Sequence, residues 1–123
     1  MAKVHSQEFV ELVNEAKGRI REIGVDEVLA RRKAGQHLLL VDVREDREWD
    51  AGHAAGARHL GRGVLERDIR EAVPDKTTPL VLYCGGGFRS ALAADNLQKM
   101  GYSDVRSMAG GWRAWLERGG PTE

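Results

Sequence analysis

The sequence has little that would cross-link the chain or place it in a membrane. Cys84 is the one cysteine among 123 residues, so no disulfide can form within the chain and nothing indicates an oxidising compartment. Every apolar run, including that from Leu38 to Val41, is far too short to span a bilayer. Residues 1–8 lack the apolar core of a secretory signal. We therefore expect a cytoplasmic protein.

An excess of charge of one sign is also missing. The chain carries 19 Lys+Arg against 19 Asp+Glu. Proteins that bind nucleic acid or anionic membranes usually show a basic excess, because phosphate contacts dominate their affinity. We expect neither kind of partner. The lone cysteine and the 4 histidines include no ligand pair at metal spacing, so we expect no metal and no other cofactor.

Length and patterning predict one ordered domain of the α/β class. The hydrophobic share of 41% and the charged share of 31% are ordinary for a soluble globular protein. Short apolar strands alternate with helical segments, which predicts three layers: a mostly parallel central sheet with helices on both faces. We expect a helical extension at 1–20, the main domain at 21–118 and a flexible tail at 119–123.

The spacing of apolar residues sets the expected elements. From Ser6 to Ile23 these residues recur with helical spacing, with Ser6 as the expected N-cap and Gly24 as the stop. Continuous apolar runs bounded by turn residues predict buried strands. Helices are expected at 6–23, 25–34, 64–73, 90–100 and a terminal segment ending at 116, with a short one within 44–50; strands are expected at 37–43, 57–60, 79–83 and 104–107.

Cys84 is the candidate catalytic residue because of the segment around it. It ends a predicted buried strand, and the sequence Gly-Gly-Gly-Phe-Arg at 85–89 leads into a predicted helix. Ligands of parallel sheets bind at the carboxyl ends of the strands. The glycines can curl so that successive N–H groups converge as an anion nest. This nest, the helix dipole and Arg89 favour the thiolate, which is the form that attacks. The alternative is a buried structural cysteine beside a turn.

Three separated segments, in order, resemble the rhodanese-like sulfurtransferase family. Together they cover roughly 21–118, so the resemblance implies a rhodanese-like fold for the main domain. The segments are Leu40-Val41-Asp42-Val43-Arg44 followed by Glu48-Trp49 and Gly52-His53-Ala54-Ala55-Gly56-Ala57; the loop Cys84 to Arg89 with Ser90; and Met108-Ala109-Gly110-Gly111-Trp112 with Trp115.

The resemblance implies that Cys84 takes a sulfane sulfur from a donor such as thiosulfate and holds it as a persulfide. The sulfur then passes to cyanide or a thiol, and a sulfur-relay protein is a further expected partner. The chain is expected as a monomer or a homodimer. Arg89 is implied to pair with the anionic donor. The implied substrate-binding loop consists of Gly85, Gly86, Gly87, Phe88 and Arg89.

Two departures from the family pattern bear on the donor. Ala55 stands where a proline is usual, and Gly85 stands where many members have a charged or aromatic residue. The second change predicts a wider and less cationic pocket, so a donor other than thiosulfate stays open. A non-catalytic binding module is one alternative function. A cysteine phosphatase is the other, but related phosphatases have a loop one residue longer than the four residues between Cys84 and Arg89.

Asp42 and Arg44 are expected to support the site, because they follow a central strand at the same sheet edge as Cys84. Asp42 is interpreted as structural, binding backbone groups of neighbouring loops. Arg44 is expected either to assist anion binding or to pair with Glu45 or Glu48.

Arg62 is the candidate for a second substrate cation. It stands between Gly61 and Gly63 in a segment that is expected to line the mouth of the pocket. His53 is interpreted as a loop histidine with satisfied hydrogen bonds rather than a base.

Overall fold

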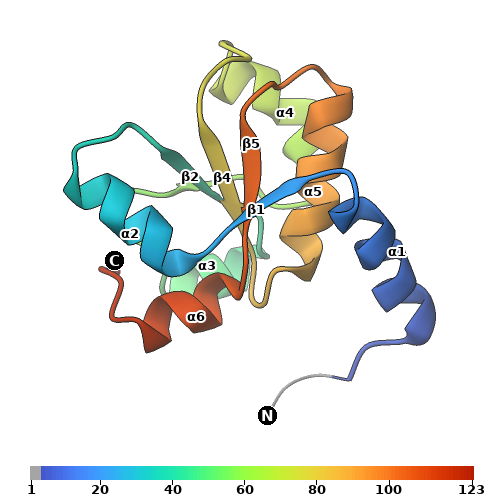
Figure 1. Ribbon diagram of the computed structural model, residues 1–123, viewed down its shortest axis with the longest axis horizontal. Helices are drawn as coiled ribbons and strands as arrows, with labels where there is room; N and C mark the ends of the chain where they lie inside the picture. The colour runs from blue at the N-terminus through green and yellow to red at the C-terminus, as the bar shows by residue number, and fades with distance from the viewer. Residues whose placement is uncertain (1–3) are drawn as a thin grey trace.

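A computed structural model describes residues 4–123 of the chain, and in this part five strands form one parallel sheet (Figure 1). The strand order is β1-β5-β4-β2-β3. The strands are β1 (Arg21–Ile23), β2 (Leu39–Asp42), β3 (Arg58–His59), β4 (Leu80–Tyr83) and β5 (Val105–Met108). The predicted α/β class with a parallel central sheet is confirmed.

Helices cover both faces of the sheet. They are α1 (Gln7–Lys17), α2 (Val25–Lys33), α3 (Asp46–Ala51), α4 (Leu65–Ala72), α5 (Phe88–Lys99) and α6 (Gly111–Glu117). Side chains alternate across a strand. Along β4, Leu80 and Leu82 therefore pack with α4 and α5, whereas Val81 and Tyr83 pack on the side of α2 and α6. Figure 1 shows the two groups of helices on opposite sides of the sheet. Within the described residues, no helix combines the length and apolar content needed to cross a membrane.

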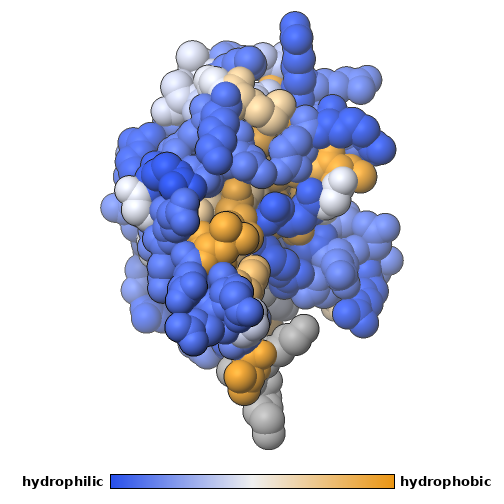
Figure 2. Space-filling model, turned by 90° about the vertical axis from the view of Figure 1, so that its right-hand side faces the viewer, coloured by the Kyte–Doolittle hydropathy of each residue, from blue (hydrophilic) through white to orange (hydrophobic). Residues whose placement is uncertain are grey.

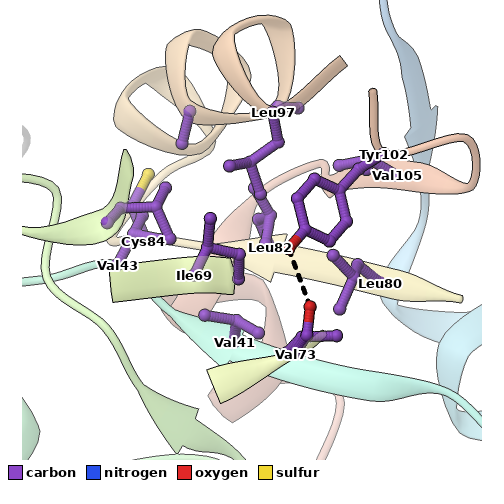
Figure 3. Packing of buried hydrophobic residues seen from close by; sticks show 13 residues of the cluster. Val41, Val43, Ile69, Val73, Leu80, Leu82, Cys84, Leu97, Tyr102 and Val105 are labelled. Carbon is purple, nitrogen blue, oxygen red and sulfur yellow. Dashed lines mark hydrogen bonds between the residues drawn. The ribbon is translucent and has the colours of Figure 1, made fainter. Parts of the chain in front are cut away.

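The core between the sheet and α4 and α5 reaches to Cys84. Figure 3 shows Cys84 beside Val43 at one end of this cluster, with Tyr102 at the other end. The Tyr102 hydroxyl donates a hydrogen bond of 2.7 Å to the carbonyl of Val73. Cys84 is only 1% exposed. Cys84 therefore packs against the apolar side chains of this core cluster.

The predicted helix over 6–23 was wrong in its last third, residues 18–23. Ser6 does cap the helix, since its side chain accepts a hydrogen bond of 3.2 Å from the N–H of Phe9. The helix ends at Lys17, however, and β1 then pairs in parallel with β5 at the edge of the sheet. Ile23 is buried in that strand. Helical spacing continues by coincidence through a segment whose backbone satisfies its hydrogen bonds with a distant strand.

The segment expected as a flexible tail, 119–123, is bonded to the domain. His53 and Glu123 exchange backbone hydrogen bonds of 3.1 and 2.9 Å. The Trp115 indole donates a bond of 2.9 Å to the carbonyl of Pro121. Gly120 lies so close to the Trp115 ring that a Cβ there would be 2.3 Å from it. Long-range contacts thus hold residues 119–123 in place, although their local sequence is typical of a flexible tail.

Candidate active site

The structure places Cys84 directly after β4, where its sulfur accepts backbone hydrogen bonds. The N–H of Gly87 lies 3.2 Å from Sγ and the N–H of Ser90 lies 3.4 Å from it. Gly87 has a φ of +103°, in the left-handed region that favours glycine. That turn aims the loop amides at the sulfur and starts α5 immediately afterwards. The sequence predicted this convergence of N–H groups.

The environment of Cys84 favours its charged form. Burial by itself raises the pKa of the thiol, but hydrogen bonds from the Ser90 hydroxyl and from the N–H groups of Ser90, Gly87 and Gly86 outweigh burial. The net effect lowers the pKa below its ordinary value. The Ser90 hydroxyl lies 3.5 Å from Sγ and also bonds the Ser107 hydroxyl at 2.8 Å. Sequence reasoning assigned no role to Ser90, although it stands in the first turn of the helix that follows the loop.

Arg89 is paired with a carboxylate of the protein itself. Its two terminal nitrogens donate to the two oxygens of Glu48 at 2.9 and 3.2 Å. This pairing is the main reason that the pKa of Arg89 is raised, and the nearby Cys84 thiolate raises it further. The implied pairing of Arg89 with the donor anion stays a prediction, because Arg89 lines the pocket that includes Cys84 but also binds Glu48. Its charge is already balanced by Glu48, and it contributes to the potential at Cys84 from that position.

Arg44 and Asp42 form a buried ion pair. The guanidinium donates three hydrogen bonds of 2.7 to 3.0 Å to the Asp42 carboxylate and one of 2.7 Å to the carbonyl of Gly52. The two residues are 3% and 0% exposed. The expected pairing of Arg44 with Glu45 or Glu48 was wrong, whereas its buried pair with Asp42 fits the predicted supporting role. Asp42 also accepts a bond of 2.9 Å from the N–H of Arg44, which fits its predicted structural role.

The structure does not bring Arg62 to the cysteine. Arg62 lines a neighbouring hollow of about 680 Å³, whose lining does not include Cys84. One of its terminal nitrogens donates to the carbonyl of Arg89 at 3.2 Å. Its predicted position at the mouth of the substrate pocket was therefore wrong. His53 stacks on Trp49 with 3.4 Å between ring centroids, and its Nδ1 lies 3.0 Å from the Trp49 carbonyl, as a satisfied loop histidine would.

A pocket of about 850 Å³ lies over Cys84 and includes residues that the sequence did not single out. The N-terminal segment contributes Val4, His5, Ser6 and Phe9 to its lining, and α6 contributes Arg113. No local sequence pattern identifies the N-terminal residues as part of the pocket, because only the packing of α1 against α5 brings them to the loop. For Arg113 a signal was present, since it directly follows the Gly-Gly-Trp of the third motif segment.

The start of α6 is fastened to the cysteine loop through its backbone. The N–H of Trp112 donates to the carbonyl of Cys84 at 2.7 Å, and the N–H of Arg113 donates to the carbonyl of Gly85 at 3.2 Å. A Cβ at Gly111 would lie 2.4 Å from the Cys84 carbonyl oxygen, and this residue has a φ of +54°. Glycine at that position permits the close approach.

This fold and site define a known class of domain. The sequence profile of the rhodanese-like domain matches residues 24–118, most of the chain. The chain therefore belongs to the rhodanese-like domain family.

Curated relatives share parts of the chain. It is 38% identical over 76 residues to the uncharacterized protein YqhL of Bacillus subtilis, which covers 62% of this chain and 59% of that protein. It is 35% identical over 85 residues to the probable adenylyltransferase/sulfurtransferase MoeZ of Mycobacterium tuberculosis, covering 69% of this chain and 22% of MoeZ. The chain thus spans less than two thirds of either relative.

Solved structures share the fold. A protein of unknown function from Rhodopseudomonas palustris, described as a possible tyrosine phosphatase, is 32% identical with a TM-score of 0.87 and covers 100% of this chain and 99% of its own. A thiosulfate sulfurtransferase from Pseudomonas aeruginosa is 26% identical with a TM-score of 0.81, covering 94% of this chain and 22% of that one.

Proposed function

We propose that the protein is a sulfurtransferase in which Cys84 carries a sulfane sulfur as a persulfide from a donor to a thiol or cyanide acceptor. The observation that carries this proposal is the set of hydrogen-bonding groups around one sulfur: the N–H groups of Gly87 and Ser90, which donate to it, and the Ser90 hydroxyl 3.5 Å away. They lower the pKa of a thiol that burial alone would keep protonated. An isolated structural cysteine needs no such arrangement.

Each half of the reaction uses the same sulfur atom and the same donors. The Cys84 thiolate attacks the outer sulfur of the donor, a new S–S bond forms, and the S–S bond of the donor breaks with its electron pair leaving on the remainder. With thiosulfate the remainder is sulfite. An acceptor thiolate then attacks the terminal sulfur of the persulfide and restores the Cys84 thiolate. Loop N–H groups stabilise the negative charge on sulfur throughout, because they are oriented before the reaction begins.

Membership of the rhodanese-like family supports this function, as do the sulfurtransferase names of MoeZ and the Pseudomonas aeruginosa protein. We extend the proposal to the partners: a small-molecule sulfur donor, and a thiol acceptor that can belong to a sulfur-relay protein. A reducing compartment such as the cytoplasm suits a catalyst that depends on one free thiol.

Intact-mass measurement tests the proposal directly. After incubation with thiosulfate, the protein gains the mass of one sulfur atom, and treatment with cyanide or a reducing thiol removes it. The Cys84→Ser variant gains nothing. If the unmodified protein forms no adduct with thiosulfate or with an organic persulfide, the proposal is wrong.

Tyrosine phosphatase activity is a second candidate, because the Rhodopseudomonas palustris protein described in that way matches the whole chain at 32% identity. The loop argues against it. Only four residues separate Cys84 from Arg89, and Arg89 is engaged by Glu48 rather than open to a phosphate. Hydrolysis of an aryl phosphate that is lost in Cys84→Ser would favour the phosphatase, and its absence alongside a sulfur adduct would favour sulfur transfer.

A further inference from the structure

One cation at the Cys84 pocket has no carboxylate partner in the described part of the chain. Three arginines line this pocket: Arg47, Arg89 and Arg113. Arg89 is bound by Glu48, and the Nε of Arg47 lies 3.2 Å from a carboxylate oxygen of Glu45. Arg113 is exposed and forms no ion pair with residues 4–123. It is therefore the cation best able to receive a negative charge from a ligand.

The position of Arg113 relative to Cys84 is set by backbone contacts. Its N–H donates to the carbonyl of Gly85, the residue next to the cysteine. Gly111 allows α6 to approach the loop closely enough for that bond. This hydrogen bond fixes the backbone of Arg113 at the pocket rim. The side chain is not part of the bond and can still rotate to bring the guanidinium to a ligand.

Besides this cation, the pocket has a ring-lined surface, which we call the aromatic wall. It consists of His5, Phe9 and Phe88. The ring centroids lie 4.9 Å apart for His5 and Phe88, 5.1 Å for His5 and Phe9, and 5.9 Å for Phe9 and Phe88. All three residues line the Cys84 pocket. Two of them, His5 and Phe9, lie outside the family match at 24–118, whereas Phe88 lies within it.

Helix α1, which carries Phe9 of the wall, is held in place by packing and by an ion pair. Helix α1 packs against α5. Just beyond its end, Arg19 donates to both carboxylate oxygens of Asp95 at 2.8 and 3.0 Å, and Asp95 is only 6% exposed. An element anchored by packing and by a two-bonded ion pair can present a side chain at a constant position, as specificity requires.

We propose that Arg113 and the aromatic wall form a donor-selecting subsite for organic sulfane-sulfur donors that carry an anionic head on an apolar body. This inference rests on the proposed role of Cys84 as the sulfur carrier. The pocket volume of about 850 Å³ falls in the range of roughly 300–1,000 Å³ that is usual for organic ligands. An inorganic anion would leave most of the pocket, and the whole wall, without contact.

An aromatic thiosulfonate is the model substrate of this class. The Cys84 thiolate attacks its outer sulfur, the S–S bond of the thiosulfonate breaks, and the electron pair leaves on the sulfinate. One anion and one thiolate thus give one persulfide anion and one sulfinate, and no oxidant or reductant is consumed. The sulfonyl oxygens bind Arg113 while the aromatic ring packs on Phe9 and Phe88.

Donor selectivity is the readout, measured as the ratio of kcat/KM for benzenethiosulfonate to kcat/KM for thiosulfate, with cyanide as acceptor and thiocyanate as product. In Phe9→Ala we expect this ratio to fall by about tenfold, because the apolar contact serves only the aromatic donor. The ratio is insensitive to the fraction of folded enzyme, since misfolding lowers both values equally. Leu12→Ala is the matched control. Leu12 is 53% exposed on the same helix and does not line the pocket. On the face shown in Figure 2, hydrophobic residues form only small patches among hydrophilic ones.

Arg113→Ala is expected to lower kcat/KM for both anionic donors by about tenfold, with partial recovery in Arg113→Lys. Arg118→Ala, which removes another exposed arginine after α6, is the control and leaves both values unchanged. An unchanged ratio in Phe9→Ala, an equal fall in Leu12→Ala, or full activity in Arg113→Ala overturns the subsite. Failure of the unmodified protein to form the sulfur adduct overturns instead the proposed function on which the subsite rests.

Discussion

The guanidinium of Arg89 and the carboxylate of Glu48 meet through two hydrogen bonds, of 2.9 and 3.2 Å, although 41 positions separate them in the sequence. Glu48 lies in α3 and Arg89 in the first turn of α5. The pair therefore ties the loop of Cys84 to the segment that follows β2. It also neutralises a cation that would otherwise stand unpaired at a helix N-terminus, where positive charge is unfavourable.

Replacing Glu48 by Gln tests what this pair contributes. Hydrogen bonding by Arg89 is the main cause that lowers the pKa of Glu48. A carboxylate with a lowered pKa stabilises the fold at pH values above its ordinary pKa of about 4.3, and that contribution is lost as the pH falls through the lowered folded-state value. We expect Glu48→Gln to cost about 1–2 kcal/mol at pH 7.

Urea unfolding at pH 7 and at successively lower pH measures the effect. The difference between Glu48→Gln and the unmodified protein should shrink as the pH drops below about 4. Glu117→Gln, an exposed residue without an ion pair in the described chain, should show little difference at any pH. A cost that stays constant with pH would mean that the charge of Glu48 is not what stabilises the loop.

Ser90→Ala should make Cys84 less acidic. The Ser90 hydroxyl is the largest of the effects that lower the pKa of Cys84 against the opposing effect of burial. A hydrogen bond to a charged group contributes about 1.5–3 kcal/mol, so its loss should move the midpoint of iodoacetamide alkylation upward by roughly one pH unit or more. Ser103→Ala, at an exposed position, is the matched control. In the unmodified protein the midpoint should lie below the ordinary value of about 8.5; an ordinary midpoint would contradict the proposed activation.

Asp42→Asn should destabilise the protein strongly. The change leaves Arg44, only 3% exposed, without its compensating charge. Breaking a buried ion pair from one side costs about 3–5 kcal/mol. Asp68→Asn breaks the pair with Arg67 at a far more exposed site, where solvent screens the charges, and should change stability little. Thermal and urea unfolding compare the two variants. Equal costs would show that burial of the Asp42 pair has no energetic weight.

Gly111→Ala should separate α6 from the cysteine loop. The new Cβ would lie 2.4 Å from the Cys84 carbonyl oxygen and 2.9 Å from the Gly85 carbonyl carbon, which are backbone atoms that cannot turn aside. We expect a loss of about 3 kcal/mol or more, together with impaired sulfur loading. Gly35→Ala is the control, because Gly35 also has a positive φ of +78° but meets nothing within 4 Å. It should lose only the left-handed backbone cost of about 1–2 kcal/mol. A matching loss in both variants would rule out the steric contact.

Much of the site follows from local rules that act within a few residues. The apolar run before Cys84 predicts a buried strand, and the glycines after it predict a loop that can direct N–H groups inward. Both features depend on neighbouring residues in the chain, and both are found in the structure. The same holds for Ser6 as an N-cap, which needs only a residue three positions away.

Charged pairs could not be assigned in this way. Arg44 has Glu45 and Glu48 close by in sequence, yet its partner is Asp42, and Glu48 binds Arg89 instead. By spacing along the chain alone, each of these carboxylates is an equally good partner for Arg44. The choice depends on which of them the β2 end and α3 bring to the guanidinium and which are buried there.

The sequence by itself determined the parallel α/β fold and the candidate site at Cys84, because strand burial and glycine geometry are short-range properties. Tertiary structure alone decided that 21–23 form an edge strand, that 119–123 pack on the domain, and that Phe9 and Arg113 line the pocket over Cys84. These outcomes depend on contacts between segments far apart in the chain, and several pairings satisfy local preferences equally well. Only the packing of the whole domain selects one of them.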